Sequence, residues 1–547
     1  MLNSRAAGLR PAAARLLIAI GFAVSWFALL GERPLFNPDE GRYAEIPREM
    51  LVSGDWLVPR LNNLVYIEKP PLQYWATATS FELFGTNVWA ARLYTGLCGF
   101  STVLVTAWVA WRLWGTAAAW RAGIMLGSTL AVSVMSQQLT LDMSLTFFTT
   151  LTLGTFCVGQ DARAGAASRR RWMWLAWTGA GAAFMTKGLV ALVLPALTLC
   201  AYSLLYRHWK PWRRLSLTAG LVLFVLIAAP WCLLMQRHVP QFFNFFFIRE
   251  HFQRFLTRIE DRYEPVWFFI PVLALGALPW LLPAARALAT GWRAAKTATD
   301  FDPRALLWVW GIVVFVFFSA SDSKLIPYIL PLFPALALLM ASGEEAALRR
   351  DLRRTSLGVM AAGAILVVLA GLLPHLLHDP VRAAYFVQLR LPILGMGLIA
   401  IAGGWIARSR PEPTAALGMT AYMCFYLLLA SARVVAPLYS GAALAAEVIP
   451  AIMPGTPIYS VRTYDQSLPF YLGRTMTLVD SRGELDFGLK LEPQKTLVSL
   501  EAFEMRWRAE PTAFAVMEPD TYALLQGQSV PMVLRASTPG RLIVSRR

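Results

Sequence analysis

Residues 37–75, NPDEGRYAEIPREMLVSGDWLVPRLNNLVYIEKPPLQYW, hold ten charged side chains between two apolar segments. Asp39 and Glu40 open this stretch, Arg42 follows, and Glu68 and Lys69 lie near its end. Carboxylates can orient an acceptor or offset positive charge that develops on a sugar as a phosphate leaves. Arg or Lys at a partly desolvated boundary binds phosphate strongly. The stretch therefore predicts one wall of a site for a phosphorylated lipid.

Four further segments between apolar runs carry residues that could complete such a site. They are SQQLTLDMS with Asp142, MTKGL with Lys187, residues 235–265 with His251 and Arg254, and FFSASDSKLIPYILPLFP with Lys324 and Tyr328. Asp39 and Asp142 are the catalytic candidates. The candidates for binding phosphate are Arg42, Lys69, Lys187, Arg254, Lys324 and the hydroxyl of Tyr328, and Glu40 is a further candidate for binding substrate.

Each of these residues also has a simpler interpretation. A single Lys or Arg at a helix end is more often an interfacial anchor whose charge reaches water. Asp39 and Asp142 also suit the first turn of a helix, where the helix dipole favours a carboxylate. The convergence of several such residues from separate loops on one face favours a site over these alternatives.

Glu68 and His251 could together hold a divalent metal such as zinc, because both side chains are zinc ligands. A hydrogen-bonded Glu and His pair is the commoner arrangement, and sequence spacing does not place the two in contact. We therefore expect no required cofactor, and a structural metal at Glu68 and His251 is the alternative.

The composition of the chain is that of a polytopic α-helical membrane protein. Of its 547 residues, 57% are hydrophobic and 15% are charged, whereas soluble domains average roughly 45–50% apolar and about 25% charged residues. Windows of about 20 apolar residues predict about thirteen transmembrane helices. They lie near residues 13–30, 74–111, 118–135, 142–160, 172–187, 188–206, 215–235, 265–285, 305–320, 325–342, 356–376, 388–407 and 413–436.

Clusters of basic residues recur after every second predicted span, beginning with Arg5, Arg10 and Arg15 before the first. Cytoplasmic loops retain such residues, so we expect a cytoplasmic amino terminus and a carboxyl terminus on the other side of the membrane. The same clusters account for most of the net charge of +17. The basic balance therefore does not indicate a nucleic-acid partner.

We expect a transmembrane domain over residues 1–436 and a second domain over residues 437–547. The transmembrane domain has two large outer loops with helices at the membrane interface, residues 31–73 and residues 235–265. Residues 31–73 are called the first loop below. In the first loop, Asn37 as cap and Pro38 predict the start of an amphipathic interfacial helix that ends at Gly54. Short β-like runs such as TPIYSV and TAFAVM alternate with helical runs over 437–547, which predicts a small α/β domain.

The stretch PDEGRYAEIPREMLVSGDWLVPRLNNLVYIEKPPLQYW, with MTKGLVALVLP, FFFIREHFQRF and FFSASDSKLIPYILPLFP, resembles the bacterial undecaprenyl-phosphate aminoarabinose transferases that modify lipid A. The resemblance covers residues 30–340 and implies the type C glycosyltransferase fold, which protein O-mannosyltransferases share. It implies transfer of 4-amino-4-deoxy-L-arabinose from undecaprenyl phosphate to lipid A phosphates at the periplasmic face of the inner membrane. That reaction lowers negative surface charge and gives resistance to cationic peptides such as polymyxin. A lipid-linked donor agrees with the lack of a glycine-rich nucleotide loop in the sequence.

By this resemblance, Asp39 and Asp142 match the acidic residues of the family's first two outer loops. Lys69, Arg254 and Tyr328 match positions that hold the carrier phosphate, although this chain reads KLIPY where family members read KLPTY. A phosphate acceptor is already anionic and needs no strong base, which leaves Asp39 to position the amino sugar or offset developing positive charge. A single displacement with inversion is the expected course.

Two other functions fit parts of the pattern. A polyprenyl-phosphate mannose transferase acting on protein hydroxyls would keep the fold and use Asp39 as a base. A lipid flippase with an accessory domain would be expected to show internal repeats and charges at the midplane, whereas we find no repeat and the ionisable residues gather at one face. We expect a monomer whose partners are the lipid-linked aminoarabinose, lipid A and membrane lipids.

Overall fold

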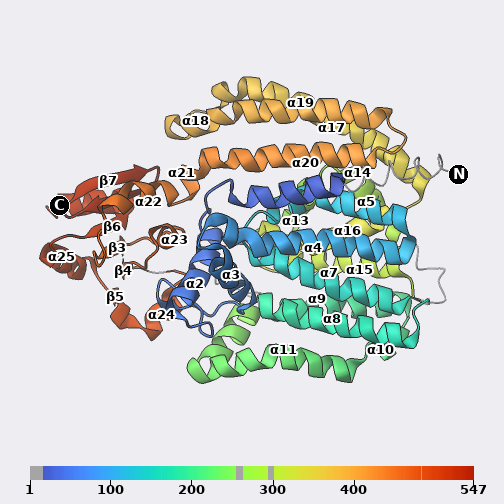
Figure 1. Ribbon diagram of the computed structural model, residues 1–547, viewed down its shortest axis with the longest axis horizontal. Helices are drawn as coiled ribbons and strands as arrows, with labels where there is room; N and C mark the ends of the chain where they lie inside the picture. Colours follow the sequence, from blue (N-terminus) through green and yellow to red (C-terminus); the bar gives the residue numbers. More distant parts are fainter. Residues whose placement is uncertain (1–16, 162, 254–262, 294–300, 482) are drawn as a thin grey trace.

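The computed structural model describes residues 17–161, 163–253, 263–293, 301–481 and 483–547. Long helices form a bundle, and an α/β domain lies at one end of it (Figure 1). The first loop, with α2 (Asp39–Ser53), lies between the bundle and this domain. This architecture confirms the predicted polytopic helical membrane protein with a C-terminal α/β domain.

Each of the thirteen segments predicted to span the membrane contains helix within the described residues. The helices are Leu17–Gly31, α4 (Val88–Trp114), α5 (Thr116–Gly127) with α6 (Leu130–Met135), α7 (Leu141–Gln160), α8 (Ala166–Lys187), α9 (Val190–Tyr206), α11 (Leu217–His238), α13 (Phe269–Gly276) with α14 (Leu281–Gly291), α15 (Pro303–Ala320), α16 (Leu332–Ala341), α17 (Glu345–Leu376), α19 (Arg390–Ser409) and α20 (Thr414–Ser431). Seven helical segments in this part of the chain are long and apolar enough to cross a membrane without interruption. The segment predicted over 74–111 divides at Gly85 into α3 (Leu72–Phe84) and α4.

Burial separates the central helices from those that face lipid. In α7, 83% of the most apolar window is buried inside the protein, against 17% in α17. The hydroxyls of Thr146 and Thr150 donate to carbonyls one turn back along α7, which satisfies them in apolar surroundings. The central helix α7 carries Asp142 in its first turn.

The structure of α2 confirms part of the prediction and corrects the rest. The helix begins at Asp39 and ends at Gly54, whose φ of +72° is a left-handed cap. Asn37 is not the cap, because its side chain binds the C-terminal domain, accepting from the backbone N–H of Ser467 at 2.8 Å. Nor does α2 lie on the surface with one face exposed. Every residue from Glu40 to Met50 is buried, because α3, the strand β1 (Arg60–Leu61) and the C-terminal domain all pack against the helix.

A short hairpin occupies the segment after α2, within residues that the sequence predicted as interfacial. It joins β1 (Arg60–Leu61) and β2 (Leu64–Val65). Asn62 and Asn63 have φ of 54° and 61°, a turn geometry that Asn tolerates. Their backbone N–H groups donate to the Glu49 carboxylate at 2.5 and 2.7 Å, so the end of α2 fixes the tip of the hairpin.

The C-terminal domain contains a six-stranded sheet of order β5-β4-β3-β6-β8-β7. Strands β3 (Ile458–Val461), β4 (Thr477–Val479), β5 (Thr496–Leu497) and β6 (Phe514–Met517) pair in parallel, and β8 (Arg541–Ser545) and β7 (Val533–Thr538) add an antiparallel edge. The helices between strands include α23 (Leu468–Leu472), α24 (Asp486–Leu491), α25 (Leu500–Ala509) and α26 (Pro519–Gly527). The predicted strands are confirmed, and the two-residue β5 was not predicted.

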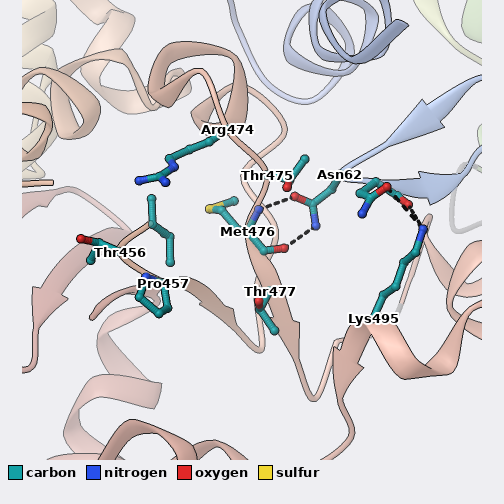
Figure 2. Close-up of a pocket in the computed structure, with 10 residues that line it drawn as sticks. Asn62, Thr456, Pro457, Arg474, Thr475, Met476, Thr477 and Lys495 are labelled. Atoms are coloured by element: carbon teal, nitrogen blue, oxygen red, sulfur yellow. Dashed lines mark hydrogen bonds between the residues drawn. The ribbon is translucent and has the colours of Figure 1, made fainter. Parts of the chain in front are cut away.

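Reciprocal hydrogen bonds tie this domain to the hairpin. Asn62 Nδ2 donates to the carbonyl of Met476 at 2.7 Å, and the N–H of Met476 donates to Asn62 Oδ1 at 2.8 Å (Figure 2). Lys495 Nζ donates to the carbonyl of Asn63 at 2.8 Å. A cavity of about 200 Å³ lies beside these contacts and is also lined by Arg474. The first loop is therefore part of the domain interface.

Gly41, in the first turn of α2, marks the closest approach between the two parts. A Cβ at this position would lie 2.4 Å from the backbone nitrogen of Ser467 and 2.5 Å from the carbonyl carbon of Gln466. Backbone atoms cannot move aside as the end of a flexible side chain can, so the contact requires glycine.

We expect Gly41→Ala to destabilise the docked domain by roughly 1–3 kcal/mol, the usual range for forcing extra atoms into a packed contact. The melting temperature of the purified protein in detergent should fall. Gly527→Ala is the matched control, because a Cβ there meets nothing within 4 Å. Equal melting temperatures for the two variants would show that the contact at Gly41 is not tight.

Glu49 should make stability depend on pH. Burial and the neighbouring Glu45 raise its pKa from 4.5 to about 8. The native state therefore keeps a proton that the unfolded chain releases, so this stabilisation is full below about pH 4.5 and is lost as the pH rises to about 8. We expect the melting temperature to fall over that range. The slope should be weaker in Glu49→Gln, whereas the exposed control Glu447→Gln should keep it.

Candidate active site

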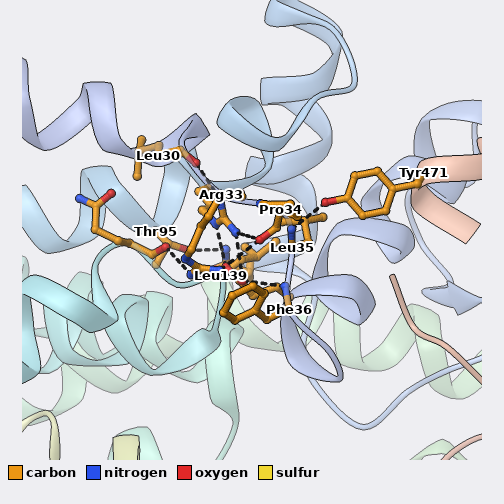
Figure 3. A network of polar contacts seen from close by, with 12 residues as sticks. Leu30, Arg33, Pro34, Leu35, Phe36, Thr95, Leu139 and Tyr471 are labelled. Atoms are coloured by element: carbon orange, nitrogen blue, oxygen red, sulfur yellow. Dashed lines mark hydrogen bonds and ion pairs between the residues drawn. The ribbon is translucent and has the colours of Figure 1, made fainter. Parts of the chain in front are cut away.

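Glu40 lies at the centre of a buried network that fixes the start of α2. Figure 3 shows three residues of this network, Arg33, Phe36 and Leu139, close together. Its carboxylate pairs with Arg33 and with Arg92 of α4, whose Nε lies 2.7 Å from Oε1. It also accepts the backbone N–H groups of Phe36 at 2.9 Å and Leu139 at 3.0 Å. Burial alone would raise the pKa of Glu40, but the two guanidinium groups lower it to about 2. The network joins the first loop to α4 and to the segment before α7.

These contacts argue against the expectation that Glu40 binds substrate, because protein donors occupy both carboxylate oxygens.

Lys324, a candidate for binding phosphate, is also satisfied by protein groups. It is buried, and its ammonium group donates to the carbonyls of Ser321 at 2.5 Å and Glu264 at 2.8 Å. Both charges hold loops in place, since a buried charge needs protein partners.

Asp39 retains contact with solvent beside Arg42. Its side chain is 38% exposed, and its Oδ1 lies 3.5 Å from Nη1 of Arg42. The Arg42 side chain is nearly buried, and its Nη2 pairs with Glu484 of the C-terminal domain at 2.5 Å. Gln466 Nε2 donates to the other oxygen of Glu484 at 2.7 Å. Arg42 is therefore held between a catalytic candidate and a carboxylate from the C-terminal domain.

Tyr43 lies between Arg42 and Tyr74 of α3. Its ring stacks on that of Tyr74 with the ring centroids 6.1 Å apart, and the Arg42 guanidinium lies 5.7 Å from the Tyr43 ring. Burial raises the pKa of Tyr43, and Arg42 opposes this rise. Three carboxylates raise the pKa further, those of Asp39, Glu68 and Asp142. Tyr43 and Tyr74 also share a buried cluster with Leu141, the first residue of α7, so Tyr43 joins the first loop to the start of that helix.

Asp142, Lys187 and Tyr328 meet from three separate segments, as the sequence predicted. Asp142 in the first turn of α7 pairs with Lys187 at the end of α8. Helix dipoles favour a carboxylate and an ammonium group at these respective ends. The Lys187 Nζ also lies 4.6 Å from the ring centroid of Tyr328, a cation–π distance. Tyr328 lies on a short 3₁₀ helix, η5 (Ile326–Ile329), just before α16.

Lys69 of the first loop forms an ion pair with the second large outer loop, residues 235–265. Its ammonium group donates to Glu250 Oε2 at 3.0 Å and to the carbonyl of Glu68 at 3.0 Å. Glu250 lies on the π-helix η2 (Asn244–Gln253). Arg254 lies outside the described residues, as does the side chain of His251, so the roles predicted for them stay predictions.

The predicted metal pair also stays a prediction, because it includes His251. Elsewhere in the described part of the chain, no group of three or more His, Cys, Asp or Glu residues is arranged to hold a metal ion.

Sequence reasoning did not place Glu484, Glu250, Tyr43 or Tyr74 in the site. The tyrosines had a usable signal, because both occur within the charged stretch 37–75 and carry a polar tip on an apolar ring. Glu250 and Glu484 had none, since their partners Lys69 and Arg42 lie in a distant part of the sequence.

Comparison with known proteins identifies the family of this chain. Residues 444–546 match the family model for the aminoarabinose transferase C-terminal domain, and residues 18–246 match that for dolichyl-phosphate-mannose-protein mannosyltransferase. The undecaprenyl phosphate-alpha-4-amino-4-deoxy-L-arabinose arabinosyl transferase of Pectobacterium carotovorum is 32% identical over 506 residues, 86% of each chain. This chain belongs to that family. Its Pseudomonas aeruginosa member is 31% identical over 90% of each chain, and a Sodalis glossinidius member is 36% identical over 64% of its own length.

A solved structure of this family superposes on almost the whole chain. ArnT from Cupriavidus metallidurans, solved with undecaprenyl phosphate bound, superposes with a TM-score of 0.91 at 35% identity over 98% of each chain. The archaeal oligosaccharyltransferase from Archaeoglobus fulgidus superposes with a TM-score of 0.52 at 12% identity, over 93% of this chain and 69% of that one. The second likeness concerns the fold alone.

We expect Glu40→Gln to destabilise the protein by roughly 3–5 kcal/mol, because it leaves two buried guanidinium groups without their counter-charge. Chemical unfolding in detergent, followed by tryptophan fluorescence, would measure this loss. Glu345→Gln is the control, since it breaks an exposed ion pair with Arg349 and should cost about 0.5 kcal/mol or less. A loss at Glu40 as small as that at Glu345 would contradict the structural role.

Proposed function

We propose that this protein is a glycosyltransferase that moves 4-amino-4-deoxy-L-arabinose from undecaprenyl phosphate to phosphate groups of lipid A. The observation that carries the proposal is the meeting of Asp142, Lys187 and Tyr328 from three separate segments. Leu141, next to Asp142, belongs to the same buried cluster as Tyr43 of the first loop. Relatives named for this transfer, and the undecaprenyl phosphate bound to ArnT from Cupriavidus metallidurans, support the choice of donor.

The residues around this cluster divide naturally into two roles. Cations and a phenol suit the carrier phosphate, and we assign this role to Lys69, Tyr328 and Arg254, with Lys187 beside Tyr328. Glu250 pairs with the ammonium group of Lys69 and fixes its position, so little reorganisation is needed as the phosphate departs from the sugar. Asp39 then orients the amino sugar or offsets the positive charge that develops on it.

The acceptor needs no strong general base, because a phosphate is already anionic at neutral pH. A single displacement that inverts the anomeric centre is the simplest course for such an acceptor, and no protein nucleophile is required. Asp142 is held in an ion pair with Lys187, so we assign it to positioning Lys187 and the bound sugar.

The same proposal fixes the orientation of the chain. The amino terminus is cytoplasmic, and the C-terminal domain and the site lie on the periplasmic side of the bacterial inner membrane, as the basic loops favour. An added amino sugar lowers the negative charge of lipid A, which weakens the attraction of cationic peptides such as polymyxin. The protein acts as a monomer and requires no metal for this chemistry.

We expect Asp39→Asn to reduce transfer by about 100-fold or more, as removal of a charge-stabilising group in an active site commonly does. Purified protein reconstituted with the lipid-linked sugar and lipid A would be assayed by mass spectrometry, and NMR of the product would give its anomeric configuration. Asp486→Asn, which breaks an exposed ion pair with Lys490, is the control and should retain full activity. Full transfer by folded Asp39→Asn would disprove the role of Asp39.

The same reconstitution separates the other two functions. Transfer to the hydroxyl of a peptide and not to lipid A would identify a protein glycosyltransferase that uses Asp39 as a base. Movement of the lipid across the bilayer without a covalent product would identify a flippase.

A further inference from the structure

Tyr74, near the start of α3, has a hydroxyl that the described protein leaves without a hydrogen bond. The side chain is fully buried, and no donor or acceptor in the described residues reaches its oxygen. The Nε–H group of Arg42 is a second buried group without a partner. Buried polar groups are normally paired, because leaving one unpaired costs its full desolvation. Two unpaired groups in one cluster therefore point to a ligand that completes both.

The position of Tyr74 puts this hydroxyl among the charges of the candidate site. Its ring stacks on Tyr43 at an interplanar angle of 29°. Tyr74 lies within electrostatic range of Glu68 and Arg42, and Tyr43 lies within range of Asp39 and Asp142. Tyr74 also belongs to the buried cluster that contains Tyr43 and Leu141, the residue next to Asp142.

We propose that the Tyr74 hydroxyl and the Nε–H of Arg42 bind the sugar of the lipid-linked donor. Sugar hydroxyls both donate and accept hydrogen bonds, and a phenol can do the same. The carboxylates around Tyr43 attract hydroxyl or ammonium groups and repel a phosphate, whereas Lys69 and Lys187 supply cations for the phosphate. Tyr74 is thus a specificity-determining residue, and this assignment rests on the proposed donor.

Tyr74→Phe tests the inference, because it keeps the stacked ring and removes only the oxygen. Binding of undecaprenyl phosphate and of undecaprenyl-phosphate aminoarabinose to the full-length protein in detergent would be measured by titration calorimetry. We expect wild-type affinity for the sugar-free lipid and about tenfold weaker binding of the sugar-bearing lipid, the effect of losing one hydrogen bond. The melting temperature should stay equal or rise, since an unpaired buried group is removed.

Tyr464→Phe is the matched control. The Tyr464 hydroxyl is also buried and unpaired within the described residues, but it belongs to the C-terminal domain, between β3 and α23, and its largest electrostatic influences are Glu45 and Glu49. This variant should bind both lipids as the wild type does.

Two results would overturn the inference. One is wild-type affinity of Tyr74→Phe for the sugar-bearing lipid, and the other is an equal loss for both lipids with a lower melting temperature. Failure of the wild type to transfer sugar to lipid A would overturn the proposed acceptor instead, because the binding comparison does not use lipid A.

Discussion

The first loop depends on the buried carboxylate of Glu40. One negative charge between two guanidinium groups can be buried here because carbonyl oxygens take the remaining donors. Arg92 alone donates to the carbonyls of Leu30, Arg33 and Pro34, each at 2.8 Å. The network fixes the end of the first helix against α4 and sets the point at which α2 begins. Asp39 and Arg42 lie in the same turn as Glu40, so their positions follow from a charge that does not face the site.

The charged residues of the site regions divide by exposure. Glu40 and Lys324 are enclosed and satisfied by protein groups, and they hold loops together. Among the described residues, the ion-pair contact of Asp39 is a long one with Arg42, and Asp39 keeps solvent access. In the same part of the chain, Lys69 and Lys187 each pair with one carboxylate and retain some exposure. A ligand can bind an exposed charge directly, or it can displace the one partner of an ion pair. Replacing all the partners in a buried network is far more costly.

The C-terminal domain holds the first loop in place. Its backbone packs directly against Gly41, and the backbone of its Met476 exchanges two hydrogen bonds with Asn62. Its Glu484 pairs with Arg42. The carboxylate of Glu484 therefore reaches the candidate site from outside the membrane bundle. Substitutions at this interface are expected to affect the site through Arg42 and through the position of α2.

The sequence by itself determined the helical membrane architecture, the α/β domain and the family. Long apolar runs leave few alternatives to membrane helices, and alternating β and α runs predict their domain locally. It also predicted that Asp142, Lys187 and Tyr328 lie on one face of the membrane, because short turns leave these residues at helix ends. Only the tertiary structure decided that Glu40 is structural, that α2 is enclosed and that Glu484 and Glu250 complete ion pairs. Those outcomes depend on which distant segments pack together, and a charged side chain carries no local signal of whether its partner will be protein, water or substrate.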